Sequence, residues 1–139
     1  MAKIVFNAET LKIMHLFETV TKSRVRDCII DSKMIIFVVG PGMISKAVGK
    51  KGVNVRTLEN KLNRKIKIVE FNSDVKRFVR NFIMPLKVDE VTEEDNVVTL
   101  KSSDKTVKSI LIGRNAQNLR KIEDYIRRHH PMLKEIKVI

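Results

Sequence analysis

The chain has 139 residues, enough for one ordinary domain or two very small ones, and its 43% apolar content excludes wholesale disorder. Lys and Arg number 28 against 16 acidic residues, which gives a formal net charge of +12. An excess of this size favours a polyanionic partner, with nucleic acid as the first candidate and an anionic membrane surface as the second. Heat adaptation alone would predict charges of balanced sign.

Several classes of protein are excluded by what the sequence lacks. Cys28 is the single cysteine, so an internal disulfide and a thiolate metal cluster are both ruled out. The N-terminal residues carry no secretory signal, and the longest uncharged run, residues 34–45, is too short to span a membrane. We therefore expect a soluble cytoplasmic monomer without a membrane partner.

The first half of the chain predicts six elements in order. Apolar residues recur at three-residue steps after Asn7, which predicts a helix capped by that side chain. Two β-rich runs around Asp-Ser-Lys predict a hairpin, which Gly-Pro-Gly then ends. A short segment leads into a pair of glycines, and a helix and a strand follow. The expected bounds are a helix from residue 7, strands 25–30 and 34–39, the short segment 43–48, a helix 53–63 and a strand 65–71.

The second half predicts the same order. Ser73 or Asp74 opens a helix that Pro85 ends. Two strands are expected around an acidic turn, and a short helix, a Gly-Arg-Asn-Ala loop, a longer helix and a last strand follow. Their expected bounds are strands 86–91 and 96–102, the turn 92–96, a helix 105–112, the loop 113–116, a helix containing Leu119, Ile122 and Ile126, and a strand 135–139.

The two halves form a repeat with a constant offset of 64 positions. A shared apolar spacing alone arises by chance, but here it comes with a glycine and an Asn-x-Arg-x-x-Glu pattern. The matching pairs are Ser45 and Ser109, Gly49 and Gly113, Asn54 and Asn118, Arg56 and Arg120, Glu59 and Glu123, and Arg64 and Arg128. We predict two tandem α-β-β-α-α-β modules, residues 1–72 and 73–139, with almost no linker between them.

The loop Gly49-Lys50-Lys51-Gly52 predicts a corner between two helices. Glycines there permit positive φ and close approach of another backbone. The helix that begins at Val53 directs its N-terminal N–H groups and positive dipole end at the corner, and the two lysines add charge, so the corner is suited to phosphate. The apolar residues Ile44, Val48 and Val53, with part of the strand 65–71, are expected to floor a groove for unstacked bases. The alternative is a tight turn with solvated lysines; recurrence and the basic charge favour nucleic acid.

Both glycine loops lie in longer motifs that resemble a known family. "AVGKKGVNVRTLENKL" and "LIGRNAQNLRKIEDYI" resemble the signature of KH domains, in which a G-x-x-G loop clamps about four nucleotides. A helix and a hairpin before the signature resemble the prokaryotic type II arrangement. The second motif is similar to the last KH domain of the transcription factor NusA, and two tandem modules with a minimal junction resemble the short archaeal NusA-like proteins.

This resemblance implies a fold and a function. The fold class is α+β, with two type II KH modules that are each a three-stranded mixed sheet covered by three helices on one face. The implied partner is single-stranded RNA in a nascent transcript, with RNA polymerase as a further partner, in transcription elongation, pausing, termination or antitermination. The implied RNA-binding residues are Ile44, Val48, Gly49, Lys50, Lys51, Gly52, Val53, Arg56, Ile112, Gly113, Arg114, Asn115, Ala116, Gln117 and Arg120.

Ala116 departs from the family pattern, because it stands where the second glycine is usual. A methyl group there crowds a phosphate or resists positive φ, so we expect the first module to supply more of the phosphate-dependent affinity. Arg56 and Arg120 could each reach phosphate, but each has a glutamate three residues on, so a helix-surface ion pair is favoured over phosphate contact. For Asn54 and Asn118 we favour a structural role at the corner over contact with a base.

Enzyme hypotheses find little support. The three histidines lack metal-ligand spacing, and "GPGMISKAVGKKG" does not match a phosphate-binding P-loop, so we expect no catalytic residue, no metal and no cofactor. Two rival functions remain open. One is a KH-fold interaction module that docks to RNA polymerase or the ribosome with little RNA affinity of its own. The other is a basic, chaperone-like protein that binds duplexes.

Overall fold

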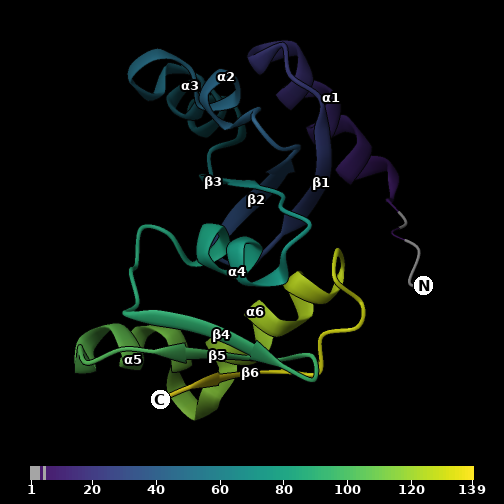
Figure 1. Cartoon of the computed structure of the whole chain (residues 1–139). Helices are drawn as coiled ribbons and strands as arrows, with labels where there is room; N and C mark the ends of the chain where they lie inside the picture. The colour runs from purple at the N-terminus through teal and green to yellow at the C-terminus, as the bar shows by residue number, and fades with distance from the viewer. Residues whose placement is uncertain (1–3, 5) are drawn as a thin grey trace. The chain divides into compact units, whose positions relative to one another are not determined.

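The computed structural model describes residue 4 and residues 6–139. The chain divides into two compact units, with the boundary in the sequence between Asn72 and Ser73 (Figure 1). Each unit contains its own three-stranded mixed sheet and its own helices. The expected α+β class is therefore confirmed.

The first unit follows the element order predicted from its sequence. Its elements are α1 (Ala8–Thr21), β1 (Val25–Ile30), β2 (Met34–Val39), α2 (Ile44–Val48), the 3-10 turn η1 (Lys50–Gly52), α3 (Val53–Leu62) and β3 (Lys65–Glu70). Strand β2 is central, antiparallel to β1 and parallel to β3. The predicted cap of α1 is confirmed, because the side chain of Asn7 accepts a 2.8 Å hydrogen bond from the amide of Thr10.

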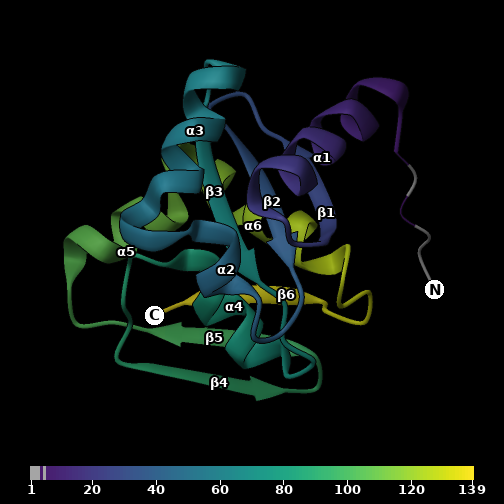
Figure 2. The same ribbon diagram turned by 90° about the horizontal axis from the view of Figure 1, so that it is seen from above.

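All three helices of the first unit pack on one hydrophobic core. Alternate residues of β2 enter this core, as the period of two in a strand requires, and they meet Phe17 of α1, Ala47 of α2 and Leu58 of α3. The rings of Phe17 and Phe37 stack with their centroids 4.3 Å apart. Figure 2 shows α1, α2 and α3 gathered over the strands. The short helix α2 is thus held by its buried alanine, and the glycine loop that follows begins from a fixed point.

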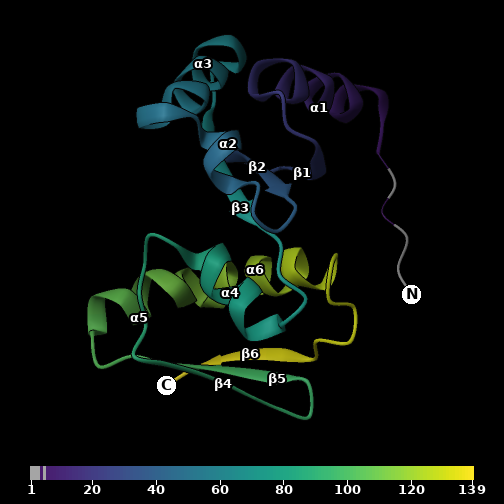
Figure 3. The same cartoon turned by 45° about the horizontal axis from the view of Figure 1, so that its top comes forward.

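The second unit repeats this plan. Its elements are α4 (Val75–Ile83), β4 (Glu90–Glu94), β5 (Val97–Lys101), α5 (Lys105–Ile112), the 3-10 turn η2 (Arg114–Ala116), α6 (Gln117–Arg127) and β6 (Glu135–Val138). Strand β5 is central, antiparallel to β4 and parallel to β6. Helices α4, α5 and α6 lie on one side of this sheet (Figure 3). Of the two residues proposed to open its first helix, Asp74 is the cap and accepts a hydrogen bond from the amide of Lys76.

The hairpin of the second unit differs from the prediction. The sequence favoured a five-residue acidic turn at 92–96, but the turn consists of Asp95 and Asn96 alone, with Glu94 paired to Val97. Both turn residues have positive φ, 52° and 66°. A two-residue turn of this kind matches the twist of the flanking strands, and Asp and Asn tolerate its backbone. Consequently β4 lies at 90–94 and not at the expected 86–91.

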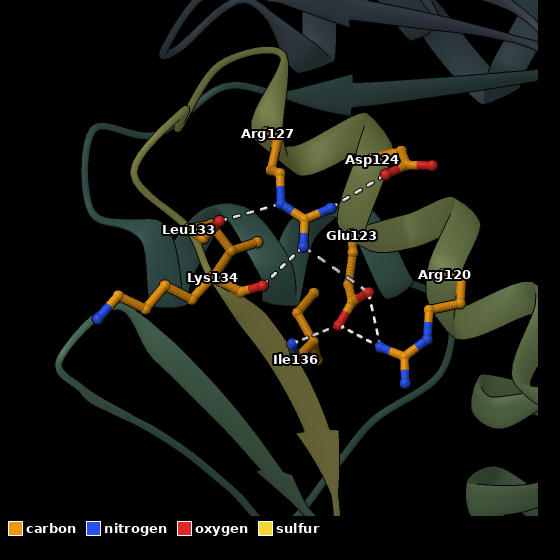
Figure 4. A network of polar contacts seen from close by, with 7 residues as sticks. All are labelled: Arg120, Glu123, Asp124, Arg127, Leu133, Lys134 and Ile136. Atoms are coloured by element: carbon orange, nitrogen blue, oxygen red, sulfur yellow. Dashed lines mark hydrogen bonds and ion pairs between the residues drawn. The ribbon is translucent and has the colours of Figure 1, made fainter.

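A buried carboxylate joins α6 to β6 (Figure 4). Glu123, nearly fully buried, accepts a 2.7 Å hydrogen bond from the amide of Ile136 and two bonds of 2.8 and 2.9 Å from Arg120. The hydrogen bond and charge of Glu123 raise the pKa of Arg120. The first unit contains the same tie, since Glu59 accepts from the amide of Ile66 at 3.4 Å. In both units a glutamate of the loop-following helix therefore holds the start of the last strand.

Arg127 fixes the connection between the same two elements. Its guanidinium donates to the carbonyl oxygens of Leu133 and Lys134, at 3.0 and 2.6 Å, and to the carboxylate of Asp124 at 3.0 Å (Figure 4). The arginine thereby ties the end of α6 to the connection that leads into β6.

Replacing Glu123 by Gln tests the carboxylate tie. Gln keeps the shape but removes the charge, so we expect the free energy of unfolding of the second unit to fall by about 1.5–3 kcal/mol, the range for hydrogen bonds to charged groups. Urea denaturation followed by circular dichroism measures this. Asp124→Asn is the control, because it removes a charge exposed on the same helix and should change stability by less than about 0.5 kcal/mol. Equal effects of the two variants would contradict the assignment.

Candidate nucleic-acid interface

The first glycine loop, Gly49 to Gly52, has a backbone that depends on its leading glycine. Gly49 ends α2 with φ 80° and ψ 166°, a conformation open essentially only to glycine. A Cβ added there would lie 2.8 Å from Nδ2 of Asn54 and 3.0 Å from a methyl group of Val53. Both the backbone conformation and the close packing therefore require glycine. The loop begins as a fixed reversal of the chain.

The next residues of the loop turn into α3 through two left-handed conformations. Lys51 has φ 55° and ψ 28°, and Gly52 has φ 74° and ψ 20°. The amide of Gly49 donates to the carbonyl of Ser45, and that of Gly52 donates to the carbonyl of Gly49, both at 3.0 Å. The side chains of Lys50 and Lys51 are exposed. The loop thus places two mobile cations at the N-terminal end of a ten-residue helix.

The second loop, Gly113 to Ala116, repeats this backbone. Gly113 has φ 72° and ψ 178°, Asn115 has φ 54° and ψ 33°, and Ala116 has φ 60° and ψ 18°. A Cβ on Gly113 would lie 2.7 Å from the Cβ of Asn118. Ala116 therefore adopts the left-handed conformation that Gly52 adopts in the first loop. Its methyl group does not prevent this conformation, but it carries the strain that an L side chain incurs there.

An asparagine spans each corner. Asn54 donates from Nδ2 to the carbonyl of Lys46 at 3.2 Å, across the loop from α3 to α2. Asn118 donates in the same way to the carbonyls of Ile110 and Leu111, at 2.9 and 3.1 Å. These carbonyls belong to the last turn of the preceding helix, where no intrahelical partner remains for them. The side chains cap one helix from the next, which agrees with the structural role favoured from the sequence.

A shallow pocket of about 400 Å³ lies beside the first loop. Its lining residues are Ile44, Ser45, Val48, Gly49 and Lys50. The structure therefore brings together four of the predicted site residues and adds Ser45, which was not among the predicted residues although it recurs as Ser109. Val53 does not line this pocket and is 46% exposed at the start of α3.

The two predicted arginines behave differently. Arg56 reaches back to the loop, where Nη1 donates to the carbonyl of Lys51 at 2.5 Å, so the ion pair suggested with Glu59 is replaced by a contact within the loop. Arg120 forms the expected ion pair with Glu123 at 2.8 Å. Among the predicted residues of the second loop, Arg114, Asn115 and Gln117 are exposed, whereas Ile112 is half-buried. Arg56 thus belongs to the first loop, and Arg120 belongs to the tie between α6 and β6.

The described residues provide neither a metal site of the usual kind nor a helix that could cross a membrane. No three or more His, Cys, Asp or Glu side chains there are grouped so as to hold a metal ion. Across the same residues, none of the helices combines the length and apolar character that crossing a bilayer demands.

Comparison with known proteins identifies relatives of the whole chain. No protein-family model matches it. The probable transcription termination protein NusA of Methanocaldococcus jannaschii is 32% identical over 143 residues, which cover 100% of this chain and 77% of that protein. The protein of the same name from Halococcus morrhuae is 29% identical over 84% of this chain and 86% of its own length.

A solved structure supports the fold. The crystal structure of APE1850 covers 96% of this chain and 100% of its own, with a TM-score of 0.72 and 24% sequence identity. At this identity the likeness concerns the fold alone. The sequence match along the full chain, together with the paired glycine loops, assigns the family: the chain belongs to the archaeal NusA-like proteins.

Proposed function

We propose that this protein binds single-stranded RNA in its two glycine loops and acts on nascent transcripts during elongation and termination. In this proposal each unit is a type II KH domain, with the first comprising residues 1–72 and the second residues 73–139. The observation that carries the proposal is the repeated loop backbone. Glycine at the first position and left-handed conformations at the third and fourth recur 64 residues apart.

The chemistry of the first loop suits a sugar-phosphate backbone. Successive N–H groups in such turn conformations form concavities that accept anions, and the N-terminal end of α3 adds its positive dipole. Lys50 and Lys51 supply two exposed cations. The adjoining pocket has an apolar wall of Ile44 and Val48, against which an unstacked base can lie. Phosphate contact and base contact are thus available side by side, as a single strand requires.

The role in transcription follows from the relatives. The archaeal proteins from Methanocaldococcus jannaschii and Halococcus morrhuae are both named probable transcription termination protein NusA. In our proposal RNA polymerase is a further partner of this chain, and the protein acts without catalysing a reaction. The rival function, docking to RNA polymerase or the ribosome with little RNA affinity, makes the opposite prediction for variants of the loop.

Reversing the charge of the first loop separates these functions. The variant Lys50→Asp/Lys51→Asp should lose about tenfold or more in affinity for an unstructured RNA oligomer, ~1.4 kcal/mol or more, because two cations at the phosphate site become anions. Fluorescence anisotropy measures the affinity, and an unchanged melting temperature shows that folding is intact. Wild-type affinity should also fall with salt at a log–log slope of about 0.7 per neutralised phosphate.

The matched control is Lys33→Asp/Lys87→Asp, which makes the same change in net charge at two exposed residues outside both loops. If the loop variant and the control bind RNA equally, the docking rival is favoured. Stronger binding of duplex than of unpaired RNA would instead favour the duplex-binding alternative.

Exchanging glycine and alanine at the fourth loop position tests the difference between the two loops. Gly52→Ala should lower stability by about 1 kcal/mol, because φ there is 74°, while its added Cβ meets Nη1 of Arg56 only at an ordinary 3.5 Å. Ala116→Gly relieves the same strain and opens the second loop. We expect RNA affinity to fall several-fold in the first variant and to rise in the second.

Affinity for the second exchange is best measured in the Lys50→Asp/Lys51→Asp background, where the second loop dominates binding. Anisotropy gives the affinities and thermal melting gives the stabilities. If Gly52→Ala and Ala116→Gly shifted the RNA affinity in the same direction, the claim that a methyl group at this position limits the second loop would be refuted.

A further inference from the structure

A second pocket in the first unit lies outside the glycine loop. It has a volume of about 560 Å³ and lies where the connection from α1 to β1 meets the loop before α2. Its lining contains four exposed cationic residues and no acidic residue. The lining residues are Lys22, Ser23, Arg24, Val25, Arg26, Gly40, Met43 and Lys46. We call this the basic pocket.

The floor and walls of the basic pocket are held by the core. Val25 and Met43 pack against the hydrophobic core of the unit. The connection from α1 is fixed by buried bonds, since Thr21 Oγ1 donates to the carbonyl of Phe17 and accepts from the amide of Ser23 at 3.1 Å. The pocket is therefore a shaped feature of the unit, framed by residues with fixed main-chain positions.

A β-bulge sets the position of Arg26. The pairing of β1 with β2 shifts between Val25 and Asp27, so Arg26 is the extra residue of the bulge. It has no partner residue on β2 in the regular register. Its guanidinium lies 4.1 Å above the ring of Phe71. In this cation–π contact the planar face of the guanidinium packs against the aromatic ring. The edge of the guanidinium carries the N–H donors, and they are not used by the stacking.

Two carboxylates on adjoining elements accept hydrogen bonds from backbone amides. Glu18 accepts from the amide of Val25 at 2.9 Å, and Glu70 accepts from the amide of Gly42 at 2.6 Å. Lys22 has a structural reason for its place, because cations suit the end of α1. Lys46 lies in the last turn of α2, where the same argument applies, whereas Arg24 lies outside the helices. A cleft lined by one sign of charge focuses its field and raises the local concentration of counter-ions.

The two pockets share α2 as a wall. Ile44 and Val48 border the pocket at the glycine loop, whereas Lys46 borders the basic pocket. At 100° per residue Lys46 faces away from both, so the two pockets open on opposite sides of this five-residue helix. A strand that passes around the short helix therefore meets cations on both sides of it.

The second unit offers an internal contrast. At the offset of 64 positions Lys46 corresponds to Ile110, and the segment before the hairpin reads Leu86-Lys87-Val88-Asp89-Glu90. The second unit repeats the leading glycine of the loop, the asparagine that caps the preceding helix and the glutamate that binds the last strand. It does not repeat this group of cations. The charges of the basic pocket are thus not needed to build the fold.

We propose that the basic pocket is a second phosphate-binding site, which holds phosphodiester groups of the RNA strand beyond the nucleotides clamped by the glycine loop. This inference rests on the proposed RNA binding. It extends the RNA path of the first unit from one side of α2 to the other. Occupancy of the pocket increases affinity only for strands longer than the four or so nucleotides that one loop clamps.

The test is charge reversal read out by RNA length. Arg24→Glu/Lys46→Glu reverses two exposed cations of the pocket, one from each of the two segments that line it, and melting checks the fold. We expect wild-type affinity for a tetranucleotide, measured by NMR titration. For an unstructured oligomer roughly three times as long, anisotropy should show a loss of about tenfold or more, with a salt slope lower by about 0.7 for each lost phosphate contact.

The matched control is Lys12→Glu/Lys33→Glu, which makes the same charge change at exposed positions of the first unit outside both pockets. An equal loss in variant and control overturns the inference, as does an equal loss on the short and long RNAs. The neutral pair Arg24→Gln/Lys46→Gln should give a smaller loss in the same direction. Failure of the proposed function is seen separately, because Lys50→Asp/Lys51→Asp would then leave tetranucleotide binding unchanged.

Discussion

The sign of one backbone angle at Gly49, and again at Gly113, is the constraint on which the corner of each unit depends. The chain must leave one helix and start the next within four residues, and it does so by passing through a conformation that side chains do not tolerate. The absence of a Cβ also admits Asn54 or Asn118 to the space beside the glycine. The asparagine then caps the helix that the glycine has ended, so the two residues act as a pair.

The corner is also joined to the sheet of its unit. Leu58 of α3 and Ile126 of α6 are completely buried, and Glu59 and Glu123 each accept a hydrogen bond from the amide of the second residue of the last strand. A helix held at both its loop end and its strand end cannot tilt without disturbing the core. The exposed cations of the loops therefore stand on a rigid base. Their side chains are exposed, while the positions from which they extend are held by the core.

Much of this could be read from the sequence, because the signals are local and occur twice. The bounds of the first hairpin, the caps at Asn7 and Asp74, and the loop-following helices were all predicted from periodicity, capping residues and glycines. The hairpin of the second unit was misplaced because Asp95 and Asn96 adopt positive φ, which lets a two-residue turn replace a longer one. Acidic composition indicated a turn but not its length.

Other features could not be predicted because they depend on distant residues meeting in space. Arg56 precedes Glu59 by three residues, a spacing that favours an ion pair, yet it contacts a loop carbonyl instead. The basic pocket joins residues 22–26 to Lys46, and no local pattern links those segments. Ser45 was visible in the repeat, but only its position at the wall of the first pocket distinguishes it from a solvated helix residue.

The left-handed residues of the loops have a consequence for the kinetics of any ligand that uses them. Lys51, Asn115 and Ala116 already adopt uncommon backbone conformations in the folded chain. The free-energy cost of these conformations is therefore part of folding and not of binding. An incoming ligand meets a preorganised surface and has little main-chain entropy to remove. Association is then governed by diffusion and long-range attraction, and differences between ligands are expressed mainly in how fast they leave.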